Sequence, residues 1–141
     1  MTSSPPMAPR TPSFLRPALG LLAGLGIFVV FIVFGTFAVY VSASGSDVRN
    51  PSVTLLGAQL VLNAAGAMAA GFATGRMTVG RSFYTVILLA LILSMSSLVP
   101  VLRETANAGE PRWYLLARPA VILIGIVIGG ALERRKRQPA A

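Results

Sequence analysis

Three polar side chains interrupt the long apolar stretches of this sequence, and they have the clearest capacity for chemistry. Gln59 and Asn63 lie one helical turn apart in the stretch 53–73, and Arg118 lies in the stretch 113–132. Polar groups inside a membrane are energetically costly, so such residues commonly mark ligand sites or ion paths. Gln59 and Arg118 are expected at similar depth. With Asn63 they would form an intramembrane polar patch able to bind a small anion or an anionic head group.

A simpler interpretation of the same residues is that they support packing. The two amides would hydrogen-bond to neighbouring helices, each contributing ~0.6–2 kcal/mol. Arg118 would lay its stem along the helix and extend its charged end to the membrane surface. Trp113 and Tyr114 are expected at the membrane interface, where amphipathic rings prefer to lie. The sequence favours this packing role and leaves the ligand-binding patch as the alternative.

Side chains that usually perform catalysis or hold metals are missing from the sequence. It has no cysteine and no histidine, and its 4 acidic residues all lie outside the apolar stretches. Acid–base and nucleophilic catalysis depend on such groups, and zinc and haem sites are commonly built from His and Cys. We therefore predict no catalytic residues, no metal site, no cofactor and no enzymatic activity.

The elements that position these residues are four apolar stretches, 19–41, 53–73, 83–102 and 113–132, which fill most of the 141 residues. About 20 residues of helix span a ~30 Å hydrocarbon layer. The chain is 55% hydrophobic and 11% charged, with mean hydropathy +0.75. The sequence predicts an all-α polytopic membrane protein. It has four transmembrane helices in an up-down bundle, because the connectors are short. Their expected ranges are 18–42, 52–75, 82–102 and 112–133.

The two ends of the chain differ in composition from this predicted bundle, 18–133. Residues 1–17 are rich in Pro and Ser and are predicted to be disordered. Residues 134–141 form a basic C-terminal tail. With four crossings, both termini and the second connector share one side, which then holds 8 of the 12 Lys and Arg residues. The positive-inside rule places that side, and so both termini, in the cytoplasm.

The net charge of +8 gives a second expectation, about partners. Basic residues at the cytoplasmic ends of the helices are expected to contact anionic lipid head groups. These are Arg76, Arg81, Arg134, Arg135, Lys136 and Arg137. The interleaving of aromatic and basic side chains that reads single-stranded nucleic acid is absent. We therefore predict membrane lipids, and no nucleic acid, as partners.

Small residues recur at helical spacing and predict close contacts between helices. GxxxG occurs three times, and small residues allow helix backbones to approach in lipid. The glycines predicted at helix contacts are Gly20, Gly24, Gly35, Gly66, Gly71, Gly75, Gly125 and Gly129. The pattern does not decide between contacts within one chain and contacts with other transmembrane helices, in a homo-oligomer or a larger complex.

A repeat of the helical hairpin is a further hypothesis. Pro51 and Pro111 each precede a helix in the same direction, and at this 60-residue offset Ala65 and Ala69 align with Gly125 and Gly129. The two hairpins would be related by an axis along the membrane normal.

Taken together, the residues favour a small integral membrane protein that acts as a helix-packing subunit or self-associating scaffold. The alternative is a small channel or carrier whose polar path includes Gln59, Asn63 and Arg118.

Overall fold

The chain forms four α-helices in a computed structural model that describes residues 14–42, 52–78, 83–102 and 111–136. Of these residues 96% are helical, and none lies in a strand, which confirms the predicted all-α fold. The helices are α1 (Leu15–Ser42), α2 (Val53–Met77), α3 (Phe83–Leu102) and α4 (Arg112–Lys136). By length and composition α1, α2 and α4 are able to cross a membrane, whereas the apolar part of α3, Phe83–Val99, is shorter.

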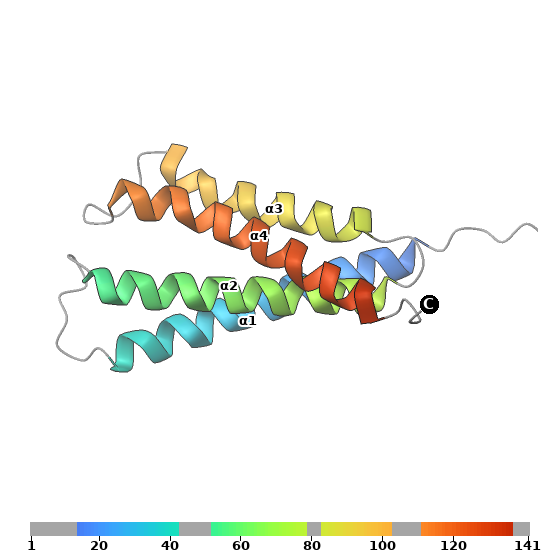
Figure 1. Cartoon of the computed structure of the whole chain (residues 1–141), viewed down its shortest axis with the longest axis horizontal. Helices are drawn as coiled ribbons and strands as arrows, with labels where there is room; N and C mark the ends of the chain where they lie inside the picture. The colour runs from blue at the N-terminus through green and yellow to red at the C-terminus, as the bar shows by residue number, and fades with distance from the viewer. Residues whose placement is uncertain (1–13, 43–51, 79–82, 103–110, 137–141) are drawn as a thin grey trace, which may run out of the picture.

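The helices alternate in direction, so α1 and α3 run one way and α2 and α4 the other (Figure 1). Their order in space is α1, α2, α4, α3, which differs from their order in the chain. The most extensive contact joins α2 to α4, followed by α1 with α2 and α3 with α4, while α1 and α4 do not touch. The bundle is therefore two antiparallel hairpins that meet through a pair of parallel helices.

Local sequence explains most of the helix ends. Ser52 caps α2, and its Oγ accepts a hydrogen bond from the backbone N–H of Leu55 at 3.2 Å, as side chains at helix N-caps do. Pro17 lies in the first turn of α1, where a missing N–H removes no helical hydrogen bond. Consequently α1 begins at Leu15, inside the segment predicted as a tail, while residues 1–13 lie outside the described ranges.

At the other end, α4 runs further than expected. It includes Arg134, Arg135 and Lys136, which the sequence assigned to the C-terminal tail. Positive charge in the last turn interacts favourably with the helix dipole and the exposed carbonyl groups there. The remainder of the predicted tail, 137–141, is not among the described residues.

The buried core is centred on α2, α3 and α4. Its members from those three helices are Ala67, Ala70, Val86, Leu89, Ala90, Leu93, Ile122 and Ile126. Helix α1 contributes Phe28 to the buried core, and its partly buried Leu21 and Ile32 pack against that core. Helix α1 is thus the edge of the bundle, with 17% of its most apolar stretch buried against 33% for α2 and for α4.

The parallel pair α2 and α4 meets backbone to backbone at two glycines. A Cβ atom at Gly71 would overlap the carbonyl oxygen of Ile126, and one at Gly129 would overlap the carbonyl oxygen of Met68. Exchanging the two helices converts one contact into the other, because Gly71 and Gly129, like Met68 and Ile126, are 58 positions apart. The crossing therefore has local two-fold symmetry.

The register of this symmetry differs from the one predicted for a repeat. The 60-residue offset aligned Ala65 and Ala69 with Gly125 and Gly129, but Ala67 is the residue opposite Gly125, with its Cβ 2.8 Å from a Cβ built on that glycine. Ala65 is exposed instead. The offset was taken from the prolines that start the helices, whereas the close approach of the backbones sets the register.

Candidate functional site

Gln59 and Tyr114 meet at the contact between α2 and α4, and Asn63 and Arg118 each follow one turn further along the same helices. We call Gln59, Asn63, Tyr114 and Arg118 the polar cluster. The Tyr114 hydroxyl donates to Gln59 Oε1 at 2.7 Å, and Asn63 Nδ2 donates to the backbone oxygen of Gln59 at 2.8 Å. Gln59 is therefore the residue that joins the cluster across the two helices.

Tyr114 is the member that was not predicted to face another helix. Like Trp113 it was expected at the membrane interface, and both lie in the first turn of α4, but Tyr114 is 1% exposed while Trp113 is 46% exposed. A step of 100° per residue separates the two rings. Tyr114 lies one turn before Arg118, on the stripe of α4 that continues to the buried Ile122 and Gly125. This spacing of four residues was the signal in the sequence that would have found it.

Two buried polar atoms in the cluster have no hydrogen-bond partner among the described residues. They are Asn63 Oδ1 and Arg118 Nε. Asn63 is 4% exposed, whereas Arg118 is only partly buried. An unsatisfied buried polar group costs ~1–3 kcal/mol. One atom is an acceptor and the other a donor, so the cluster keeps unused capacity for both kinds of hydrogen bond.

The contact predicted between Gln59 and Arg118 does not form as a hydrogen bond. Gln59 Oε1 accepts from Tyr114, and Arg118 Nε makes no such bond in the described part of the chain. Helix α3 is tied to α4 nearby, because Ser94 Oγ donates to the backbone oxygen of Pro119 at 3.1 Å. The structure thus brings Gln59 and Asn63 together, and it adds Tyr114 to them.

Every glycine predicted at a helix contact packs against another helix of the same chain. On α2, Gly66 faces Phe31 of α1, whereas Gly71 and Gly75 face α4. A Cβ at Gly75 would lie 3.5 Å from the Cβ of Glu133. The small residues of α2 therefore pack against α1 on one face of the helix and against α4 on another.

The three α1 glycines predicted at helix contacts all face α2, and Gly24 also lies against Leu89 of α3. Gly20 lies against Thr78, Gly24 against Thr74, and Gly35 against Leu62. Thr74 Oγ1 also donates to the backbone oxygen of Gly20 at 3.1 Å, a bond made possible by this close approach.

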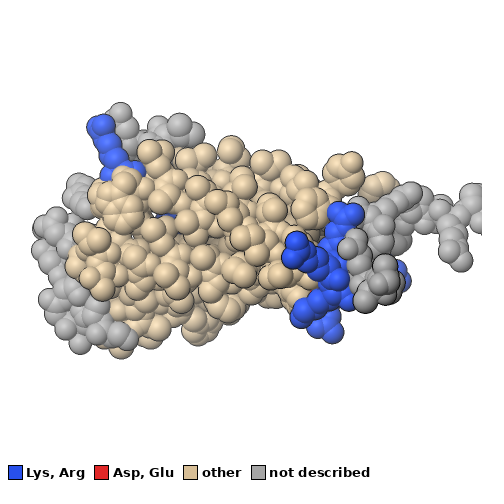
Figure 2. Space-filling model, in the orientation of Figure 1, with Lys and Arg blue, Asp and Glu red and all other residues tan. Residues whose placement is uncertain are grey.

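Basic side chains gather at the end of the bundle where α2 and α4 finish. Figure 2 shows Lys and Arg concentrated there, with uncharged residues along most of the length. Arg76, Arg134, Arg135 and Lys136 are exposed at that end. Lys136 Nζ lies 5.1 Å from the ring centroid of Phe72 and the Arg134 guanidinium 6.0 Å from that of Phe83. The two other residues predicted to contact lipid head groups, Arg81 and Arg137, lie outside the described residues.

Within the described ranges no three His, Cys, Asp or Glu side chains come together as metal ligands would. Comparison of the chain with protein families, with curated proteins and with solved structures gives no match.

Proposed function

We propose that this protein is a multi-pass membrane protein without enzymatic activity that acts as a helix-packing subunit or self-associating scaffold. The observation that supports this proposal most is that the protein's small and polar residues make contacts between helices. The glycines pack helix against helix, and the Gln59–Tyr114 and Thr74–Gly20 bonds join helices. Hydrogen bonds and close van der Waals contacts are the forces that associate helices in lipid.

The surface proposed for further helices is the open side of α1. Helix α1 touches α2 extensively, α3 slightly and α4 not at all. Its side chains Val30, Val33, Phe34 and Phe37 are exposed along that side. A helix that is covered on one side offers most of its perimeter to a neighbouring chain.

Cross-linking tests this proposal, and the absence of cysteine from the sequence gives a clean background. A Phe34→Cys variant carries its thiol at a position that is 68% exposed, and a Leu89→Cys variant at one that is 1% exposed. In native membranes we expect a bismaleimide to give covalent conjugates of the first variant and none of the second. Masses would distinguish a second copy from another protein. If single-cysteine variants at every lipid-facing position of α1 and α3 gave only the monomer after cross-linking, the proposal would be contradicted.

The proposed orientation has both termini in the cytoplasm. It is supported by the basic end of the bundle, where the last turn of α4 carries Arg134, Arg135 and Lys136. Single-cysteine variants Ser46→Cys and Ala106→Cys are expected to react with an impermeant thiol reagent in intact cells. Gln138→Cys is expected to react only after permeabilisation. The opposite pattern would reverse the orientation.

A channel or carrier is the second candidate, and the unpartnered atoms Asn63 Oδ1 and Arg118 Nε favour it. Groups of this kind at depth commonly line a path for polar solutes. If liposomes containing the protein show anion flux, Asn63→Leu and Arg118→Leu should abolish it. A Gln138→Cys variant serves as the control. Flux that survives both leucine substitutions, or no flux in wild type, would remove this candidate.

A further inference from the structure

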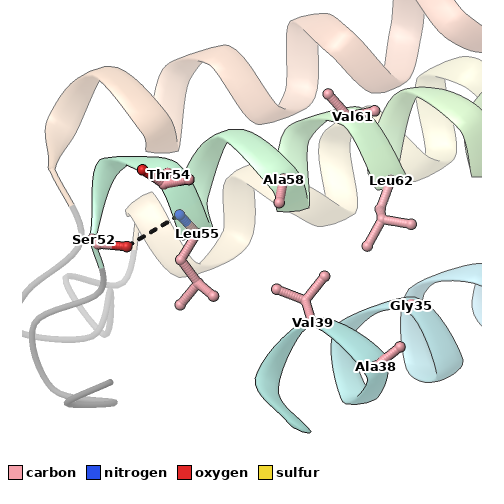
Figure 3. Close-up of a pocket in the computed structure, with 9 residues that line it drawn as sticks. All are labelled: Gly35, Ala38, Val39, Ser52, Thr54, Leu55, Ala58, Val61 and Leu62. Carbon is pink, nitrogen blue, oxygen red and sulfur yellow. Dashed lines mark hydrogen bonds between the residues drawn. The ribbon is translucent and has the colours of Figure 1, made fainter. Parts of the chain in front are cut away.

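An apolar groove separates α1 from α2 near the ends that the first connector joins. Its volume is about 590 Å³, within the ~300–1,000 Å³ typical of small-molecule sites. Figure 3 shows Leu55, Ala58 and Leu62 of α2 pointing toward α1, and Val39 of α1 pointing back. The nine residues that line the groove are Gly35, Ala38, Val39, Ser52, Thr54, Leu55, Ala58, Val61 and Leu62.

The groove has a floor where the two helices close on one another. A Cβ at Gly35 would lie 3.1 Å from both methyl carbons of Leu62, so nothing fits between them. From Gly35 toward the N-terminus of α1 the two helices stay close, with Phe31 against Gly66 and Gly24 against Thr74. From Gly35 toward the C-terminus of α1 they diverge (Figure 3). The groove is therefore open along one side and closed where Gly35 meets Leu62.

The length of the groove matches one leaflet of a bilayer. From Ser52, the cap residue of α2, to Leu62 at the floor is a rise of ~15 Å along the helix. Half of the hydrocarbon core of a bilayer is also ~15 Å thick. A transmembrane helix from a second copy or another protein needs the full thickness of ~30 Å. Because Gly35 and Leu62 close the groove at one end, a transmembrane helix could lie in it over only about half of the ~30 Å that it must cross.

The side chains that line the groove change from polar to apolar along its length. Two hydroxyl side chains, Ser52 and Thr54, lie at the mouth, and the deeper lining consists of glycine, alanine, valine and leucine. An amphiphile with a hydrogen-bonding head and an aliphatic tail matches this order, because hydroxyls bond esters or phosphates and hydrocarbon packs on hydrocarbon. Among the described residues that line the groove none is charged, and the two hydroxyl side chains offer hydrogen bonds to the ester or glycerol region of a lipid.

We propose that the α1–α2 groove binds one acyl chain of a membrane lipid. The chain enters from the leaflet at the connector end, with its ester region at Ser52 and Thr54 and its methyl end at Leu62. The bound chain packs between the C-terminal half of α1 and the start of α2, and so sets the angle between these two helices. This site does not depend on the scaffold function proposed above.

Photo-labelling in phosphatidylcholine vesicles tests the site, using a phosphatidylcholine with a diazirine in one acyl chain. Adducts mapped by mass spectrometry are expected in excess on Ala38, Val39, Ala58 and Leu62. The reference is labelling of a lipid-facing position outside the groove, Leu88, which is 47% exposed and so more accessible than the partly buried Val39 and Leu62. Moving the diazirine from the ester end to the methyl end should shift adducts from Leu55 toward Leu62.

Matched alanine substitutions supply the control. Ala58 and Ala65 are both exposed on α2, but only Ala58 lines the groove. Ala58→Trp should fill the groove and remove the excess labelling, whereas Ala65→Trp should leave it unchanged. Ala38→Trp fills the groove from the α1 wall, so the test does not depend on one variant folding.

Two results would overturn the inference. One is labelling that follows exposure alone, with no excess in the groove and no loss in Ala58→Trp or Ala38→Trp. The other is a cross-link from Ala58 to a peptide of a second copy, which would make the groove a protein interface.

Discussion

Adding a single methyl group at the α2–α4 crossing is the most direct test of how these two helices are held together. In Gly129→Ala the added Cβ would overlap the carbonyl oxygen of Met68, and in Gly71→Ala that of Ile126. Both obstacles are backbone atoms, which no rotamer change relieves. Ordinary van der Waals contact begins near 3.4 Å, so the helices must separate by about 1 Å, which forfeits a quarter to a half of the dispersion energy along the seam.

This separation gives an expected magnitude. Adding a methyl group to a tightly packed contact destabilises by ~1–3 kcal/mol, and we expect that loss for each variant. The double variant should lose less than the two single losses combined, because the first methyl group already moves the helices apart. The free energy of unfolding, measured by titrating the micellar protein with a denaturing detergent, reports these values.

Two other glycines provide matched controls. A Cβ at Gly26 of α1 or at Gly57 of α2 meets nothing within 4 Å. Gly26→Ala and Gly57→Ala are therefore expected to be neutral or to stabilise by ~0.4–1 kcal/mol, since alanine restricts the unfolded chain. If Gly71→Ala and Gly129→Ala behave like these controls, backbone contact does not hold α2 against α4, and the reasoning is refuted.

Three further substitutions test individual polar contacts through the same unfolding measurement. Tyr114→Phe removes the hydroxyl that donates to Gln59 and should destabilise by ~0.5–1.5 kcal/mol; in a double-mutant cycle, Gln59→Leu should then cost less than it does alone. Thr74→Val removes the donor to the Gly20 carbonyl and should destabilise by ~0.5–1.5 kcal/mol, whereas Thr74→Ser should stay near wild type. Equal losses in these two would argue against the bond. Asn63→Leu removes an amide whose Oδ1 has no partner in the described helices, and should be neutral or stabilising; a loss above ~2 kcal/mol would contradict this.

The helical fold could be predicted from the sequence because lipid makes strict demands on a chain. Backbone groups in hydrocarbon must be satisfied within each segment, which leaves helices as the solution for an apolar stretch of about 20 residues. The start of α2 was predicted to within one residue, because the expected range begins at 52 and α2 begins at Val53, after its cap Ser52. These are local features, and local features set where helices begin and end.

The order of the helices in space could not be read in the same way. Each helix carries small residues. Composition alone does not say that α2 packs extensively against α4 and only slightly against α3. That choice depends on the register in which Gly71 and Gly129 fit the opposite backbone. The inward position of Tyr114 has the same origin, because the crossing decides which stripe of α4 faces α2.

The pairing of α2 with α4 also has a consequence for biosynthesis. The first hairpin is complete before the second is made, so the glycine face of α2 enters the bilayer with its eventual neighbour still unsynthesised. Something else, either lipid or the insertion machinery, must cover Gly71 during that interval. Because the crossing joins two hairpins that each carry their own connector, a polypeptide severed within 79–82 is expected to reassemble when both halves are made together.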